Sequence, residues 1–265
     1  PPNTAQLDYA SKFFHKHAPN FLASFPSFRF FPKSDTPEIA LLGMSNVGKS
    51  SLANAVFRGY QREVLARTSK IPGHTKEMVA FMIGPQIVNV KNSEWKDGKK
   101  VEWVGPSRWC GKGGLVVVDM PGYGARSQEE WGRQIMKYLS VRKQLRRAFL
   151  LVDITRGLKP NDRDVLNMMR ESGVPHQIIL TKADKLLFPS GTTSKTDASF
   201  LTKGMQTVKD RQQEIYDEIT MERKGNTVLA DILTVSAGSG RKHTHVQKMG
   251  IDSLRWAIMQ CAGLE

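Results

Sequence analysis

A short glycine-rich segment between two apolar runs constrains this chain more than any other feature. The segment reads "LLGMSNVGKSSLAN" and fits the pattern GxxxxGK[ST] at Gly43, Gly48, Lys49 and Ser50. A strand-like run, "EIALLG", precedes the glycines, and a helix-period run follows them. A strand that turns through glycines into a helix collects backbone N–H groups at the helix N-terminus, where the dipole favours anions. The segment therefore predicts a phosphate-binding loop, with a flexible glycine turn as the simpler alternative.

The side chains of this loop have distinct predicted roles. We expect Lys49 to reach the terminal phosphates, where it would act in catalysis, and the Ser50 hydroxyl to ligate the Mg²⁺ that bridges them. The predicted nucleotide-binding residues of the loop are Ser45, Asn46, Val47, Gly48, Lys49, Ser50 and Ser51.

Short apolar runs alternate with helix-period segments from residue 37 onward. The predicted strands are 38–42, 78–83, 114–120, 147–154, 176–180 and 232–236, and the predicted helices are 49–57, 129–146, 161–172 and 201–223. This alternation indicates an α/β fold with a doubly wound, mostly parallel sheet and helices on both faces. Ligands of such sheets bind beyond the carboxyl ends of the strands.

The first 36 residues differ from the rest in composition. They are rich in phenylalanine, and Pro19, Pro26 and Pro32 interrupt the segment. We expect residues 1–36 to be an extended lead-in that packs its aromatic side chains on the main domain. A partner-binding arm is the alternative interpretation.

The main domain is predicted to span residues 37–265. Two stretches interrupt its α/β pattern: residues 89–113, which are polar and basic with three tryptophans, and the Ser/Thr-rich residues 188–200. The first is expected to extend a hairpin or form a surface insertion, and the second to be a loop.

A second phosphate-sensing element, "DMPGYG", ends the most apolar strand. Asp119 is predicted to hold Mg²⁺, and the Gly122 N–H to approach the γ-phosphate during catalysis because no Cβ intervenes. Between the loop and Asp119, Thr75 in "SKIPGHTKE" is the predicted third Mg²⁺ ligand and a catalytic residue. The simpler interpretations are a strand followed by a Pro-Gly turn and an ordinary loop threonine.

The segment "TKAD" supplies the argument for base selectivity. Guanine offers two adjacent donors that the Asp184 carboxylate can accept together, whereas adenine does not. Thr181 closes the preceding strand, and Lys182 would lay its aliphatic stem along the base. Near the end of the chain, the backbone of Ser236 and Ala237 could contact the guanine carbonyl. Taken alone, "TKAD" could also be a helix-capping turn.

Charge and cysteine content limit the remaining classes. Lys and Arg number 39 against 25 Asp and Glu, and this net charge of +14 favours polyanionic partners such as RNA or a ribonucleoprotein. Charge alone does not separate RNA from anionic lipid, and matrix proteins are often basic for no specific reason. No run approaches the roughly 18 apolar residues of a membrane span, so no transmembrane helix is expected. The two cysteines lack zinc-site spacing, and a reducing compartment fits them best.

A basic segment follows "DMPGYG". Its cations, on the basic helix predicted for "RQIMKYLSVRKQLRR", are Arg133, Lys137, Arg142, Lys143, Arg146 and Arg147. They form either a solvated face or an RNA contact.

Five motifs together carry a resemblance. The segments "GMSNVGKSS", "KIPGHTK", "DMPGYG", "LTKADKL" and a late "SA" resemble the translation-factor-related GTPases and are most similar to the EngB (YihA) family, from about residue 20 to 262. The resemblance implies a Ras-like domain, GTP or GDP with Mg²⁺, and a role in large-subunit ribosome assembly. It also implies rRNA and ribosomal proteins of a large-subunit precursor as partners. We expect a monomer.

Several features depart from compact bacterial members of that family. They are the two insertions, the aromatic lead-in, the basic charge and a start at Pro that suggests a trimmed or processed chain. Organellar relatives serve the mitochondrial ribosome, so the resemblance favours a mitochondrial member in the matrix, with the bacterial cytoplasm or the chloroplast as the competing locations.

The resemblance also bears on how the attacking water is activated. Tyr123 stands where many Ras-like GTPases have a water-orienting glutamine, and a tyrosine cannot act in the same way. Asn46 matches the asparagine through which some relatives bind K⁺, so K⁺ is a further expected cofactor. A local hydrogen bond within the loop is the simpler role for Asn46.

The favoured hypothesis is a slow, switch-like GTPase that converts GTP and water to GDP and phosphate during assembly of the large ribosomal subunit. A nucleotide kinase would have no use for "TKAD". Two competing hypotheses are a membrane- or filament-associated GTPase, for which the sequence offers no recognisable stalk or coiled coil, and a general RNA-binding P-loop protein.

Overall fold

The structure is a computed structural model of the chain. It describes residues 1–57, 77–84, 90–96, 99–105, 108–109, 113–123, 129–188, 198–221, 232–238 and 248–265, of which 90–96, 99–105, 108–109, 129–131 and 198–200 are described by their backbone only.

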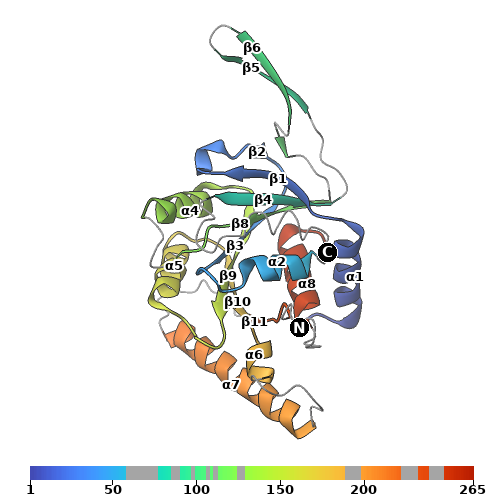
Figure 1. The fold of residues 1–265 in the computed structure, drawn as a ribbon, viewed down its shortest axis with the longest axis vertical. Helices are drawn as coiled ribbons and strands as arrows, with labels where there is room; N and C mark the ends of the chain where they lie inside the picture. The colour runs from blue at the N-terminus through green and yellow to red at the C-terminus, as the bar shows by residue number, and fades with distance from the viewer. Residues whose placement is uncertain are drawn as a thin grey trace.

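A seven-stranded sheet forms the centre of the molecule (Figure 1). Its strands, in spatial order, are β1 (Asn20–Phe25), β4 (Met78–Ile83), β8 (Leu115–Asp119), β3 (Glu38–Gly43), β9 (Leu145–Asp153), β10 (His176–Thr181) and β11 (Leu233–Thr234). The β1–β4 and β4–β8 pairs are antiparallel, and the other four pairs are parallel. The predicted α/β fold with a mostly parallel sheet is therefore confirmed.

Helices cover both faces of the sheet (Figure 1). Helices α4 (Glu129–Val141), α5 (Pro160–Glu171) and α7 (Ala198–Met221) pack on one face, and α1 (Thr4–Lys16), α2 (Lys49–Val56) and α8 (Ile251–Ala262) on the other. Successive side chains of a strand point to opposite faces. In β3, Ala40 and Leu42 belong to the hydrophobic core on the face covered by α4, α5 and α7. Ile39 and Leu41 belong to the core on the face covered by α1, α2 and α8. Burial on both faces explains why "EIALLG" is continuously apolar after its first residue.

The N-terminal lead-in is not an extended segment, so that expectation is wrong for its first half. Residues Thr4–Lys16 form α1, with a capping box between Asn3 and Gln6 at its start. The three prolines all lie after this helix and do not interrupt it. The helix packs on α8 through the buried Ala10 and Phe14.

The second half of the lead-in is part of the main sheet. Strand β1 adds to the free edge of β4, and a 3₁₀ turn, η1 (Phe28–Phe30), follows it. Phe31 lies 4.2 Å from Phe25 and 5.0 Å from Tyr138 of α4, measured between ring centroids. These aromatic contacts attach the segment to the domain, as the phenylalanine content suggested.

The first insertion contains a hairpin. Strands β5 (Val90–Lys96) and β6 (Lys99–Gly105) pair antiparallel, and β7 (Arg108–Trp109) then pairs parallel with β2 (Lys33–Ser34). The second insertion lies mostly outside the described residues, which resume with α7 after the short α6 (Asp184–Leu187).

The predicted helix 129–146 is too long. Helix α4 ends at Val141, and β9 begins at Leu145, so Arg146 and Arg147 belong to a strand rather than to the helix. A turn at Arg142 permits this, because its N–H bonds to the Tyr138 carbonyl while the Leu145 N–H bonds to the Arg142 carbonyl. Among the described helices, none combines the length and the apolarity that crossing a bilayer requires.

Candidate functional site

The glycine-rich loop joins β3 to the first turn of α2. Gly43 and Gly48 have φ angles of 155° and 108°, where side chains other than glycine are strained. A Cβ on Gly43 would lie 2.8 Å from both the Leu151 carbonyl oxygen and a Val47 methyl carbon. The two glycines therefore allow the loop to turn tightly against β9 before the helix starts at Lys49.

Lys49 lies inside this loop. Its Nζ donates to the carbonyl oxygens of Gly43, at 2.9 Å, and Met44, at 3.3 Å. Burial lowers the pKa of the Lys49 ammonium, and the nearby Asp119 carboxylate partly offsets that effect. The ammonium is thus held at the floor of the loop, next to the helix N-terminus where a phosphate group would carry its negative charge.

Asp119 ends β8 beside Lys49. Its Oδ1 atom is buried and has no hydrogen-bond partner among the residues that the structure describes. Burial raises the pKa of Asp119 from 3.8 to about 6, although the charge of Lys49 acts in the opposite direction. A buried carboxylate oxygen without a donor is the chemistry that a hard cation satisfies. Asp119, with the Ser50 hydroxyl in the first turn of α2, therefore fits a Mg²⁺ ion.

Gly122 packs directly against the phosphate loop. A Cβ at this position would lie 2.9 Å from Ser45 Oγ and 3.1 Å from Lys49 Nζ. Any side chain there would occupy the space between the loop and the lysine. The glycine in "DMPGYG" is therefore required for this close approach.

The Tyr123 side chain is directed toward α5. Its backbone carbonyl accepts a hydrogen bond from the Ser45 N–H at 3.1 Å, and its buried hydroxyl donates to Asp162 Oδ1 of α5 at 2.7 Å. Burial and the Asp162 carboxylate together raise the pKa of Tyr123 well above its usual value. Tyr123 thus links the segment that follows β8 to the phosphate loop and to α5.

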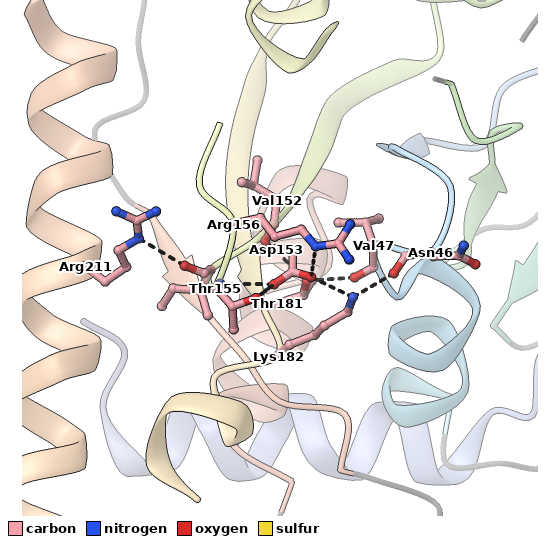
Figure 2. Close-up of polar contacts among 10 residues, drawn as sticks. Asn46, Val47, Val152, Asp153, Thr155, Arg156, Thr181, Lys182 and Arg211 are labelled. Atoms are coloured by element: carbon pink, nitrogen blue, oxygen red, sulfur yellow. Dashed lines mark hydrogen bonds and ion pairs between the residues drawn. The ribbon is translucent and has the colours of Figure 1, made fainter. Parts of the chain in front are cut away.

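The segment predicted to bind the base starts at Thr181 and contacts the phosphate loop (Figure 2). The Thr181 hydroxyl donates to the Val47 carbonyl at 2.8 Å, and Lys182 Nζ donates to the Asn46 carbonyl at 2.7 Å. The Lys182 backbone is left-handed, with φ of 63°, which turns its side chain back over the loop. The stem of Lys182 therefore lies close to Gly48.

Asp184 and Ser236 meet at the other end of the site. The Ser236 hydroxyl donates to Asp184 Oδ1 at 2.8 Å and accepts from the Gly238 N–H at 3.2 Å. The Ala183 N–H bonds to the Val235 carbonyl at 3.3 Å, which joins the segment before Asp184 to the strand end that leads to Ser236 and Ala237. The two sequence motifs predicted to bind guanine are thus neighbours, although about 50 residues separate them.

Asp153 is a member of the site that sequence reasoning missed. It ends β9 and accepts hydrogen bonds from Lys182 Nζ, at 2.7 Å, and from the Thr155 hydroxyl, at 2.6 Å (Figure 2). Burial alone would raise its pKa, but the bonds from Lys182 and Thr155 lower the pKa overall. The available signal was an acidic residue at the end of an apolar strand, the same signal that singled out Asp119.

Thr75 and the rest of "SKIPGHTKE" up to residue 76 lie outside the described residues, so the predicted third Mg²⁺ ligand has no described position. All other predicted site residues are described. Since β3, β8, β9, β10 and β11 run parallel, their carboxyl ends share one edge of the sheet, and the predicted phosphate and guanine residues follow four of these ends.

A family model described as "50S ribosome-binding GTPase" matches residues 38–182, more than half of the chain. Among curated proteins, a probable GTP-binding protein EngB of Rhizobium etli is 32% identical over 253 residues, which cover 92% of each chain. The chain belongs to the EngB family of GTPases. A second relative, the probable EngB of Rhodospirillum rubrum, is 41% identical over 172 residues, which cover 63% of this chain and 63% of that protein.

The match to the Rhizobium protein extends over nearly the whole EngB-family chain, whereas the Rhodospirillum match is confined to less than two thirds of both proteins. A crystal structure of a probable EngB covers 86% of this chain and 99% of its own, with 18% identity and a TM-score of 0.41. The assignment to the EngB family therefore rests on the sequence matches.

Proposed function

We propose that this EngB-family protein binds GTP, hydrolyses it to GDP and phosphate, and acts as a switch in assembly of the large ribosomal subunit. The observation that carries the proposal is the single edge of the sheet that holds Lys49, Asp119 and the Asp184–Ser236 pair. This arrangement offers one end for phosphate and the other for a base with paired donors.

At the phosphate end, backbone N–H groups at the start of α2 and the Lys49 ammonium would bind the β- and γ-phosphates. Ser50 and Asp119 would hold Mg²⁺, and Thr75 is proposed to complete the set. Mg²⁺ supplies positive charge between the two phosphates when it is bound. The Gly122 N–H would face the γ-phosphate. Glycine permits this approach, because a Cβ at this position would be too close to Ser45.

Hydrolysis needs a water molecule positioned in line with the γ-phosphate, and no covalent intermediate on the protein. Tyr123 is a poor candidate for orienting that water because its hydroxyl is already bonded to Asp162. We therefore propose that K⁺, bound with the help of Asn46, adds positive charge near the phosphates. Equal turnover in K⁺ and Na⁺, with large-subunit particles present or absent, would contradict this part of the proposal.

At the base end, Asp184 would accept the two adjacent donors of guanine. The bond from Ser236 fixes the carboxylate orientation before the nucleotide arrives, so less entropy is lost on binding. Lys182 is held by Asn46 and Asp153 and would cover one face of the base.

Calorimetric titration with GDP, a GTP analogue, XDP and ADP tests this assignment, using the intact protein and Asp184→Asn in Mg²⁺ and K⁺. We expect tight guanine binding, no measurable ADP binding, and a preference for XDP in the variant, because xanthine offers an acceptor where guanine offers a donor. Equal affinity for ADP and GDP would refute the guanine assignment. Unchanged selectivity in Asp184→Asn would refute the role of this carboxylate.

The ribosomal part of the proposal is supported by the description of the matching family model and by the net charge of +14. We propose further that the partner is a precursor of the mitochondrial large subunit, that the protein acts in the mitochondrial matrix, and that it acts as a monomer. Co-sedimentation with large-subunit precursors in the GTP-analogue state, and release with GDP, would support the switch. Equal co-sedimentation in the GTP-analogue and GDP states would contradict the switch. A cytosolic location in cell fractionation would contradict the mitochondrial assignment.

A further inference from the structure

The 3₁₀ turn η1 packs against helix α4, and exposed cations lie on both elements beside an exposed aromatic ring. We define the η1–α4 face by Arg29, Phe30, Lys33, Arg133 and Lys137. The Phe30 side chain is 51% exposed, and the Arg29 guanidinium carbon lies 4.6 Å from the centroid of its ring. The three other residues are also exposed. This face lies on elements that do not form the nucleotide site.

The ring of Phe30 is presented from a well-anchored segment. Just before it, the Ser27 hydroxyl and the Phe28 N–H both donate to the Gln134 side-chain oxygen of α4, at 3.0 and 3.1 Å. The Phe28 ring packs edge-on against Tyr138, with 6.0 Å between ring centroids. Phe30 is therefore exposed although its neighbours are fixed to α4.

The exit of this segment is fixed as well. The Pro32 carbonyl accepts a hydrogen bond from Arg142 at 2.9 Å, and β2 then pairs with β7. The segment between β1 and β2, which contains η1, contacts α4 (Figure 1). An anchored aromatic side chain loses little conformational entropy when a planar ligand stacks on it.

The charge of the face has one sign. Arg133 and Lys137 are one helical turn apart on α4, and Arg29 and Lys33 flank Phe30 in sequence. Residues 27–34 and 132–141 contain no Asp or Glu. The nearest acidic residues in sequence are Glu129 and Glu130 at the start of α4 and Asp35 after β2. Such a face complements a polyanion.

We propose that the η1–α4 face binds single-stranded RNA, with a base stacked on Phe30 and the four cations at phosphate groups. Single-stranded nucleic acids are bound by this combination of aromatic platforms and basic grooves. A membrane surface fits less well, because one aromatic ring and the exposed Val141 offer little apolar area for insertion. The proposal rests on the proposed ribosomal function for its biological setting, but nucleotide binding does not depend on this face.

The test is fluorescence anisotropy with a labelled 12-nucleotide single-stranded RNA and the full chain. We expect Phe30→Ala to weaken binding about 5- to 100-fold and Phe30→Trp to retain it, since loss of a stacked base costs on that order. We expect Arg133→Gln/Lys137→Gln to lower the magnitude of the slope of log affinity against log salt by about 1.4, at ~0.7 for each phosphate contact.

The matched control is Lys203→Gln/Lys209→Gln, which removes the same charge from two exposed positions of α7. We expect it to bind the RNA as the unchanged protein does. If the control loses as much affinity as the α4 variant, or if Phe30→Ala binds normally, the proposal is wrong. Vesicles of anionic lipid that bind in a Phe30-dependent manner, without RNA binding, would also overturn it.

Calorimetric GDP binding, measured on every variant, separates this proposal from the proposed function. All of these variants are expected to bind GDP like the unchanged protein, which also reports that they fold. If the unchanged protein does not bind GDP, the GTPase site is refuted, whereas the RNA measurement stays valid. Normal GDP binding with no effect of Phe30 on RNA affinity would refute only the η1–α4 face.

Discussion

Asp119→Asn is expected to stabilise the nucleotide-free protein while weakening its response to Mg²⁺. Burial raises the pKa of Asp119 from 3.8 to about 6, and Oδ1 has no donor among the described residues. A pKa difference of about 2 between folded and unfolded states corresponds to ~3 kcal/mol that the ionised carboxylate costs the folded protein at pH 7. This cost is already net of the attraction to Lys49, but asparagine adds a buried NH₂ group that also needs a hydrogen-bond partner. The expected gain in the free energy of unfolding is therefore about 1–3 kcal/mol.

Urea denaturation at pH 4 to 8, without nucleotide, measures this gain. A carboxyl with a raised folded-state pKa favours folding when it is protonated, so its contribution is fully present below about pH 4 and is lost as the pH rises to about 6. The stability difference between Asp119→Asn and the unchanged protein should therefore be small at pH 4 and reach its full size above pH 6.

Added Mg²⁺ and GDP should reduce the stability advantage of Asp119→Asn over the unchanged protein. A ligand at 100 times its dissociation constant stabilises a protein by about 2.7 kcal/mol, and the variant should gain less because it lacks the carboxylate proposed to bind Mg²⁺. The reasoning is refuted if the variant is the less stable protein at pH 7 without nucleotide. A stability difference that stays constant from pH 4 to 8 would likewise show that Asp119 is not the titrating group.

Three further substitutions test one buried ion pair of the fold and two contacts of the site. Arg142→Met leaves the buried Glu38 carboxylate without its cation and should lower the free energy of unfolding by about 3–5 kcal/mol in urea denaturation; a loss below 1 kcal/mol would contradict this. Tyr123→Phe removes a buried hydroxyl bond to a carboxylate and should cost about 1.5–3 kcal/mol in the same assay, whereas no loss would mean that the bond contributes nothing. Ser236→Ala frees Asp184 and should weaken GDP binding about 2- to 12-fold by calorimetry, with unchanged affinity as the contrary result.

Most of the sheet could be predicted from the sequence because its strands are buried on both faces. Each of the six predicted strands contains or overlaps an observed one, since a continuous apolar run bounded by turns leaves few other structures. Strand β1 was not predicted. Its sequence, "NFLASF", lies between prolines, and only the unpaired edge of β4 makes it a strand.

The boundary between α4 and β9 shows a second limit of local patterns. The segment from Arg133 to Arg146 has helical periodicity and no glycine or proline to end the helix. The helix nevertheless ends at Val141, because Arg142 is held by the Glu38 carboxylate and the Pro32 carbonyl. Partners from distant parts of the chain set this boundary.

Most residues proposed to bind the nucleotide could be predicted from the sequence. They lie at or after the carboxyl ends of strands, and these ends share one edge of the sheet. Periodicity and the glycine, lysine and carboxylate positions suffice for that inference. The sequence did not reveal that Asp153 holds Lys182, or that the Tyr123 hydroxyl bonds to Asp162 of α5. Side-chain direction at a strand end depends on what packs beside it, and local spacing does not contain that information.

Short motifs and the period of apolar residues were thus enough to establish the α/β class, the phosphate loop and the family resemblance, because each of these is written into local sequence. Packing in three dimensions was needed to show that the lead-in supplies a helix and an edge strand, that Ser236 meets Asp184, and that Phe30 remains exposed beside α4. The physical reason is that each of these features depends on which distant segments of the chain contact one another. The packing of the helices on the sheet decides those contacts.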